Sequence, residues 1–321
     1  MPVSTTRLAA SLAAVLLAGC GSVADPNEPG EGGPLETVIM GTGPVGGTYY
    51  PLGGALAQMW TDEVEGLSVS TLATDASVDN LRALDAGDIQ LGMAVSGIAA
   101  DAVAGEGEFA EPLDFALLGN LYPEFVQIAA VADSGIEVLA DLEGRRVAVG
   151  PAGSGTRAMA EAILQAAGVT PGATVEADFG EAAVGLGEGT VDAVIGVLAV
   201  PDTALGEVAT ATGITLVPIP EDVRAVLVDA DPTLTATPIP AGAYAGVEEP
   251  VASLRSWAAV YVVRDLDHDQ VYRLTEALYE HAGTVDNSVA EAIDVATATE
   301  GRTGVELHPG AAEYYGEQGV E

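Results

Sequence analysis

The chain has 321 residues, of which 48 are acidic and 10 are basic, so its formal net charge at pH 7 is −38. This charge excludes a general affinity for nucleic acids and for anionic membrane surfaces. All ten basic residues are arginines. The absence of lysine excludes a Walker A loop, a Schiff base and a serine–lysine pair. We expect the scattered acids to form a solvated surface suited to high ionic strength, where salt screens their mutual repulsion.

The first twenty residues have the pattern of an export signal. Arg7 is followed by an apolar run over residues 8–17, and then by Leu17-Ala18-Gly19-Cys20. The apolar run is too short to remain as a membrane span. Its end resembles a bacterial lipobox, in which the cysteine carries the lipid. We therefore predict a signal peptide over residues 1–20, lipidation at Cys20 and an extracytoplasmic, membrane-anchored protein.

Residues 21–36 are rich in glycine, proline and acids, and contain little that a core would bury. This composition predicts a flexible acidic tether. Because Cys20 is the only cysteine, an intramolecular disulfide is excluded.

After the tether, strand-like and helix-like patterns alternate. Residues 36–41 form a short apolar run, and residues 49–64 carry Leu52, Leu56, Met59 or Trp60, and Val64 on one helical stripe. Residues 68–74 read as a strand. Residues 77–87 read as a helix with Ser77 as its N-cap, and residues 88–95 alternate as a strand does. This order predicts a mostly parallel α/β sheet.

The second half of the chain repeats the plan. A strand over residues 147–149 leads into a glycine-rich turn over 150–155, and the next helix turns Ala160, Ile163 or Leu164, and Ala167 inward. Residues 179–197 then repeat the helix–glycine–strand pattern of residues 78–95. We therefore predict two similar α/β lobes.

Each lobe contains a glycine-rich turn directly before a helix, and these two turns are the best candidates for a binding site. The first amides of a helix lack internal partners and carry partial positive charge, so they attract anions. The first turn supplies Gly47, Thr48 and Tyr49. The second supplies Ser154, Gly155 and Thr156, with Arg157 next to it as a possible carboxylate clamp. Two facing helix starts would hold a small anionic ligand without a basic surface.

An alternative reading of the first turn is a nicotinamide site. Residues 41–46 match the GxGxxG fingerprint literally. That reading explains neither the second turn nor the export signal. The chain lacks a GxSxG elbow, and His268, His281 and His308 have no metal-ligand spacing. We therefore expect no catalytic residue, no metal and no cofactor, and we predict that the protein is not an enzyme.

The chain resembles the TAXI family of solute receptors, which serve tripartite ATP-independent periplasmic (TRAP) transporters. Seven segments carry the resemblance: GTGPVGGTYYPLGGALA at 41–57, SVDNLRALDAGDIQLGMA at 77–94, LYPEFVQIAA at 121–130, LEGRRVAVGPAGSGT at 142–156, IPAGAYAG at 239–246, VYRLTEALYE at 271–280 and ELHPGAAEYYGEQG at 306–319. They span nearly the whole mature chain in order. The resemblance implies a type II periplasmic-binding-protein fold, with two lobes, a hinge and a central ligand cleft. It also implies capture of a small carboxylate or acidic amino acid, such as glutamate or 2-oxoglutarate.

The family's cleft positions fall on ten residues of this sequence: Gly47, Thr48, Tyr49, Ser77, Asn80, Tyr122, Gln127, Ser154, Gly155 and Thr156. Arg157 is added from its place beside the second turn. Three of these eleven have an equally simple structural explanation. Tyr49 would pack its helix on the sheet, Asn80 would be solvated in a first helical turn, and Arg157 would lie on the surface. Where many family members have an acid after the second strand, this chain has Ser96 and Gly97.

The same resemblance sets the expected domain boundaries and partners. We expect lobe I over residues 37–123 plus 245–321 and lobe II over 124–244, with hinge positions near 122–127 and 242–244. The partners are the TRAP permease subunits, the membrane is met only through the lipid, and we expect a monomer. A lipoprotein sensor that docks to a signalling partner is the alternative, because the same fold serves both roles.

Overall fold

The computed structural model describes Met1 and residues 34–320. The predicted signal peptide, Cys20 and most of the tether lie outside the described residues. The strands are β1 Thr37–Gly41, β2 Ser68–Leu72, β3 Leu91–Val95, β4 Ala116–Val131, β5 Arg146–Ala148, β6 Ala173–Val175, β7 Ala193–Leu198, β8 Ile214–Leu216, β9 Thr235–Ala236 and β10 Leu254–Val262. The α-helices are α1 Tyr49–Glu63, α2 Ser77–Asp85, α3 Ser96–Ala104, α4 Gly155–Ala167, α5 Phe179–Glu188, α6 Thr203–Thr212, α7 Glu221–Ala230, α8 His268–His281 and α9 Pro309–Gln318. Four 3-10 helices are η1 Leu139–Leu142, η2 Ala282–Thr284, η3 Ser288–Ala292 and η4 Val295–Thr297.

One mixed sheet runs through these residues in the order β2-β1-β3-β10-β4-β7-β5-β6, with β8 beside β4 and β9 beside β10. β1 pairs in parallel with β2 and β3, and β5 pairs in parallel with β6 and β7, as the two repeated patterns predicted. The predicted strand over 147–149 lies one residue earlier, at Arg146–Ala148. Each antiparallel strand pair involves β4 or β10, and these two strands also pair with each other.

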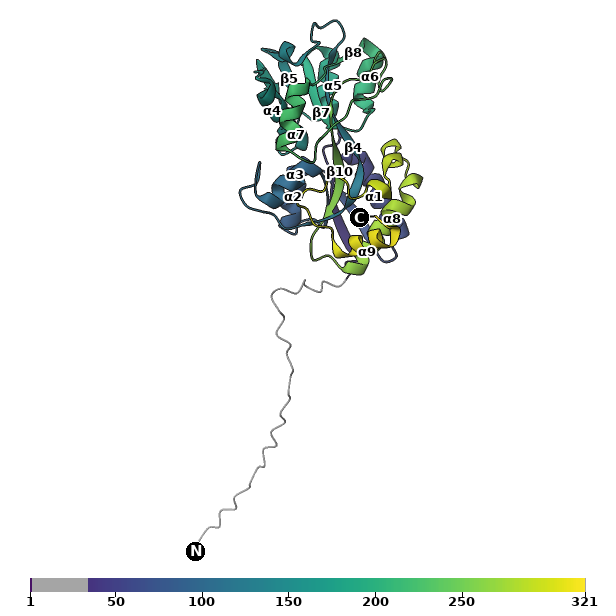
Figure 1. Ribbon diagram of the computed structural model, residues 1–321. Helices are drawn as coiled ribbons and strands as arrows, with labels where there is room; N and C mark the ends of the chain where they lie inside the picture. Colours follow the sequence, from purple (N-terminus) through teal and green to yellow (C-terminus); the bar gives the residue numbers. More distant parts are fainter. Residues whose placement is uncertain (2–33, 321) are drawn as a thin grey trace. The chain divides into compact units, whose positions relative to one another are not determined.

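Strands β4 and β10 join the two parallel groups. The first part of β4 pairs with β10, and from Phe125 onward β4 pairs with β7. Figure 1 shows the two strands running between two groups of helices. We call the elements around β1–β3, together with α8 and α9, the first lobe, and the elements around β5–β8 the second lobe. Each lobe is thus an α/β unit built on one part of β4.

The chain returns to the first lobe at a different place from residues 242–244, where one of the two hinge positions is expected. Tyr244 is buried in the second lobe's core together with Val247, and Ile239 bridges to Val251. The return strand is β10, which begins at Leu254. The glycine-rich appearance of residues 239–246 reflects a turn inside the second lobe, where Gly242 has a φ of 77°.

The predicted helical stripes account for the packing of the helices that carry the site. In α1, Leu52, Leu56 and Trp60 are fully buried, and the Trp60 Nε1 group donates a 2.9 Å hydrogen bond to the Leu274 carbonyl of α8. In α4, Ala160, Ile163 and Leu164 are buried. Apolar burial on this stripe holds the start of each helix at a fixed place beside the sheet.

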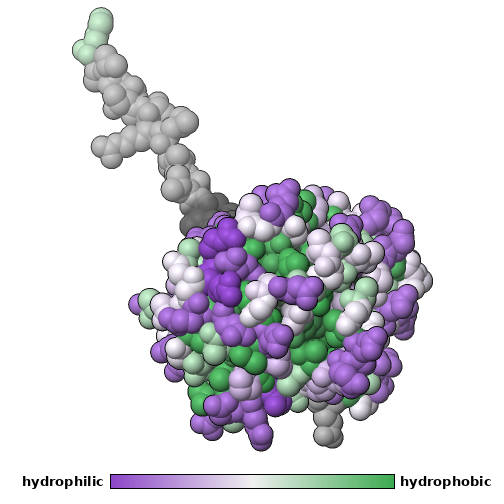
Figure 2. Space-filling view, turned by 90° about the horizontal axis from the view of Figure 1, so that it is seen from above, coloured by the Kyte–Doolittle hydropathy of each residue, from purple (hydrophilic) through white to green (hydrophobic). Residues whose placement is uncertain are grey.

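The C-terminal helices complete the first lobe. The Tyr315 hydroxyl of α9 donates a 2.6 Å hydrogen bond to the Leu118 carbonyl of β4. Figure 2 shows hydrophilic residues spread over much of the visible face. Among the residues that the structure describes, no helix combines the length and the apolar character needed to cross a membrane.

Candidate functional site

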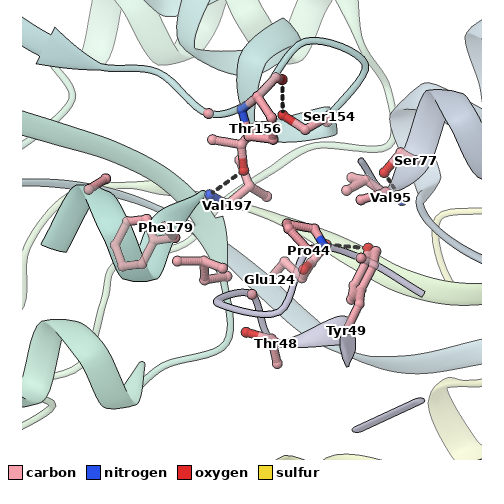
Figure 3. Close-up of a pocket in the computed structure, with 18 of the residues that line it drawn as sticks. Pro44, Thr48, Tyr49, Ser77, Val95, Glu124, Ser154, Thr156, Phe179 and Val197 are labelled. Carbon is pink, nitrogen blue, oxygen red and sulfur yellow. Dashed lines mark hydrogen bonds between the residues drawn. The ribbon is translucent and has the colours of Figure 1, made fainter. Parts of the chain in front are cut away.

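A pocket, partly open to solvent, lies between the two lobes. The first lobe contributes the turn before α1, the start of α2 and the end of β3. The second lobe contributes the turn before α4, the start of α5 and the end of β7. The lining residues are Gly43, Pro44, Gly47, Thr48, Tyr49, Ala76, Ser77, Val95, Glu124, Gly150, Pro151, Ser154, Gly155, Thr156, Ala177, Phe179, Ala182, Ile195, Val197 and Leu198. Figure 3 shows labelled residues from both lobes around this space.

The first glycine turn reaches the pocket. Gly47, Thr48 and Tyr49 all line it. Thr48 occupies the N-cap position of α1 with helical backbone angles, and its side chain makes no capping hydrogen bond. The start of α1 therefore keeps first-turn amides without an intrahelical partner beside the pocket. Tyr49 is buried, whereas Tyr50 is 40% exposed, so Tyr49 is the tyrosine that faces the interior.

The second glycine turn also lines the pocket, but its two hydroxyl groups have different roles. Ser154 caps α4: its Oγ accepts from the Arg157 amide at 3.1 Å and donates to the Pro151 carbonyl at 2.8 Å. The Thr156 Oγ1 accepts from the Val197 amide at 3.2 Å, as Figure 3 shows, so its own proton remains available. Thr156 is therefore the hydroxyl donor of this turn, and Ser154 serves the helix start.

Ser77 lies in the pocket, although it is not the predicted N-cap. The cap position of α2 is Ala76, which has a φ of 77°, and Ser77 is the first helical residue. The Ser77 Oγ accepts from the Val95 amide at 3.2 Å and so ties α2 to the end of β3. Like Thr156, it keeps a hydroxyl proton that can be donated.

Three predicted site residues lie outside the pocket lining because their polar groups hold the fold together. The Asn80 amide donates to the carbonyls of Thr42 and Met93 at 2.7 and 2.8 Å. Gln127 donates to the Ala199 carbonyl at 2.9 Å and accepts from the Tyr244 hydroxyl. Tyr122 is 1% exposed and donates to Glu124 at 3.1 Å. These three residues therefore belong to the walls behind the pocket.

Arg157 also lies outside the pocket lining. Its Nη1 is 2.7 Å from Glu176 Oε1, and its Nε pairs with Glu161 in the next turn of α4. These two carboxylates raise the pKa of the guanidinium group. The carboxylate clamp predicted from its sequence position is not formed here, because the side chain turns toward two surface acids.

The two lobes are in contact around the pocket. A Cβ atom on Gly46 would lie 3.0 Å from both the Gly180 backbone nitrogen and the Asp178 Cγ, at the start of α5. On the other side, a Cβ on Gly155 would lie 2.9 Å from Val95 Cγ2. Only a residue without a side chain permits these approaches. The structure is therefore a closed arrangement of the two glycine turns.

Packing explains the glycines of the GxGxxG match. A Cβ on Gly41 would lie 2.7 Å from Ile89 Cδ1 inside the first lobe, and one on Gly43 would lie 3.1 Å from Tyr49 Cβ. Gly46 meets the second lobe, as described above. Each position is filled by protein atoms, so the pattern arises without a pyrophosphate.

Sequence reasoning missed Glu124, a buried carboxyl group on the wall of the pocket. Glu124 lies on β4 and is 2% exposed. Its Oε2 accepts from the Tyr49 hydroxyl at 3.0 Å, and its Oε1 accepts from the Tyr122 hydroxyl at 3.1 Å. Burial raises its pKa to about 8, although the two phenol donors act in the opposite direction. Glu124 lies within segment 121–130, which carries part of the resemblance, but nothing in the sequence distinguishes it from the other acids among the 48.

No group of three or more histidine, cysteine or acidic side chains suited to a metal ion occurs within residues 34–320. The pocket walls are mainly apolar, with Phe179, Ile195 and Val197 in the second lobe and Val95 in the first. Hydroxyl groups, first-turn amides and one carboxyl group supply its polarity. This arrangement can hold a small molecule.

A known family model matches residues 40–319, which is most of the chain. The chain belongs to the NMT1-like family. Three solved structures resemble this NMT1-like protein over most of its length. MatC from Rhodopseudomonas palustris, with bound malate, is 18% identical, with a TM-score of 0.56 over 88% of this chain and 97% of MatC.

The second structure, from Bordetella bronchiseptica RB50, is 16% identical, with a TM-score of 0.52 over 89% of this chain and 81% of its own. The third is PhnD1 from Prochlorococcus marinus in complex with methylphosphonate. It is 10% identical, with a TM-score of 0.52 over 80% of this chain and 88% of PhnD1. The mixed α/β fold with its curled sheet is that of periplasmic substrate-binding proteins.

Proposed function

We propose that this NMT1-like protein is an extracytoplasmic solute-binding receptor of the TAXI type. It captures a small carboxylate or acidic amino acid, such as glutamate or 2-oxoglutarate, and delivers it to a TRAP permease. The observation that carries this proposal is the convergence of two helix starts, α1 and α4, on one pocket between the lobes. Lipidation at Cys20 would keep the receptor at the membrane face.

The first-turn amides explain how the pocket would hold a carboxylate. Among the described residues, the amides of Gly155 and Thr156 make no backbone hydrogen bond, since Ser154 caps only Arg157. The Thr156 and Ser77 hydroxyls add donors from opposite lobes. Hydrogen bonds to a charged acceptor are stronger than neutral ones, and the enclosed site strengthens them further. Ligand binding would therefore favour the closed arrangement.

Isothermal titration calorimetry of the purified protein tests the proposal. The panel should contain L-glutamate, 2-oxoglutarate, malate and L-leucine in buffer with high salt. We expect saturable one-to-one binding of at least one of these carboxylates. The absence of binding to a broader panel of carboxylates and amino acids, by a protein whose thermal unfolding is cooperative, would reject the proposed function. A shift or loss of NADH absorbance near 340 nm in the presence of the protein would instead support the alternative of a nicotinamide-dependent oxidoreductase.

A further inference from the structure

The side chain of Glu124 has hydrogen-bonding capacity that the protein does not use. A carboxylate has about four lone-pair positions. Tyr49 occupies one of these on Oε2 and Tyr122 occupies one on Oε1. One position on each oxygen therefore remains. Because Glu124 lines the pocket, a ligand can reach these positions.

The pocket contains no cation to match this carboxylate. Among the pocket residues that the structure describes, none is an arginine or a histidine, and Glu124 is the only acid. Both phenol groups that donate to it are neutral and deeply buried. A buried carboxylate is costly unless a positive group pairs with it. If Glu124 is ionised in the complex, the ligand must therefore supply the positive charge.

We infer that Glu124 accepts the ammonium group of the ligand, so that the receptor takes an amino acid rather than a dicarboxylate or oxo acid without an amine. The inference rests on the proposed function, because the ligand's carboxylate is assigned to the amides and hydroxyls of the two glycine turns. The zwitterion then places its negative end at Thr156 and its positive end at Glu124. This arrangement accounts for a carboxylate site with no arginine in its walls.

If Glu124 acted instead as a hydrogen-bond donor to the ligand, the ligand affinity would depend on pH in the opposite direction. A protonated Glu124 would donate to a ligand oxygen, and the affinity would then fall as the pH rises. If Glu124 accepts an ammonium group, it must be ionised, and the affinity rises with pH up to about 8, where its pKa lies. The other titratable groups near it are Tyr49, Tyr122, Tyr261 and Asp202. The pKa values of all four are raised, and the phenols stay neutral throughout this range.

The test compares amino acids with their oxo-acid counterparts. Affinities are measured by calorimetry at pH 6 and pH 8 for two pairs: L-glutamate with 2-oxoglutarate, and L-leucine with 4-methyl-2-oxopentanoate. Within each pair the two molecules differ only at the α-carbon, where the amino acid carries an ammonium group and the oxo acid carries a carbonyl oxygen. We expect at least one amino acid to bind roughly ten-fold to a hundred-fold more tightly than its oxo acid at pH 8, as for a charged hydrogen bond. Its affinity should fall about ten-fold per pH unit below pH 8.

The variant Glu124→Gln should abolish the preference for the amino acid over its oxo acid. Glu188→Gln, at the exposed end of α5, is the matched control and should behave as the unmodified protein. The pH profile of the unmodified protein tests the inference even if Glu124→Gln does not fold. Equal affinities within both pairs, or affinity that falls with pH, would overturn the role of Glu124 and leave the proposed function standing. No binding of any of these probes or of the broader panel would overturn both.

Discussion

The backbone amide of Val78 donates a 3.0 Å hydrogen bond to the carbonyl of Gly153. Val78 lies in the first turn of α2 in the first lobe, and Gly153 lies in the second glycine turn with a φ of 80°. The bond joins the two lobes directly at the edge of the pocket. Together with the close approach of Gly46 to Gly180, it fixes the closed position of the glycine turns around the ligand space.

A single methyl group at Gly46 should weaken ligand binding by opposing closure. In Gly46→Ala, the new Cβ would clash with the Asp178 carboxylate that caps α5 and would lie 3.0 Å from the backbone nitrogen of Gly180, so the first glycine turn and the start of α5 must move apart. The apparent affinity falls in proportion to the population of the closed state. We expect a loss of roughly ten-fold in calorimetry and a larger radius of gyration by X-ray scattering.

Gly206→Ala is the control for this change, because Gly206 is a helical glycine of α6 with no atom near the added Cβ. It should leave both the affinity and the scattering curve unchanged. The interpretation of the Gly46 contact would be wrong if Gly46→Ala bound the ligand as tightly as the control.

The two hydroxyls of the second glycine turn should give different results. Thr156→Val keeps the shape of the side chain but removes the hydroxyl that faces the pocket, and we expect the binding free energy to weaken by about 1–3 kcal/mol. Ser154→Ala removes the cap of α4 and should lower the free energy of unfolding by about 1 kcal/mol. Chemical denaturation measures the second effect and calorimetry the first. If Ser154→Ala weakened binding more than Thr156→Val, the assignment of these roles would be reversed.

Arg157 should contribute little to ligand affinity. Its guanidinium group pairs with Glu161 and Glu176 outside the pocket lining. The Arg157 side chain is 24% exposed, and a pair of this kind typically contributes about 0–1 kcal/mol to stability. We therefore expect the ligand affinity of Arg157→Gln to lie within about two-fold of that of the unmodified protein. A loss of binding comparable to that of Thr156→Val would show that Arg157 turns into the pocket when the ligand is present.

The sequence predicted the main elements of the fold because their signals are local. Leu52, Leu56 and Trp60 follow helical spacing and are buried on the predicted face of α1. Both glycine turns line one pocket, and the repeated strand–turn–helix plan is the sequence signal that marks them. The return of the chain at β10 rather than near Tyr244 depends on long-range pairing with β3 and β4, which has no local pattern.

The polar residues of the site were harder to predict, because their roles depend on neighbours far away in the sequence. The family resemblance predicts Asn80 in the cleft, but its partners are carbonyl groups of Thr42 and Met93. Glu124 resembled any other acid until Tyr49, 75 residues earlier, was seen to donate to it. Only the folded chain shows that this carboxyl group is buried.

The buried carboxyl of Glu124 should make the stability of the free protein depend on pH. Its pKa is raised to about 8, whereas an exposed glutamate has a value of 4.5. Between these two pH values the native state retains a proton that the unfolded state has lost. Stability therefore falls as the pH rises through this range, by at most about 1.4 kcal/mol per pH unit. Glu124→Gln cannot ionise, so it should lack this loss.

The measurement is the free energy of unfolding of each protein in urea at several pH values from 5 to 8, without ligand and at constant salt. The difference between Glu124→Gln and the unmodified protein should grow in favour of the variant by a few kcal/mol as the pH rises, because each pKa unit corresponds to about 1.4 kcal/mol. Glu188→Gln reports the background effect of removing one surface charge from so acidic a chain. If the curves of Glu124→Gln and the unmodified protein ran parallel, Glu124 would already be ionised near its ordinary pKa. The pocket would then have to stabilise a bare carboxylate with Tyr49 and Tyr122 alone.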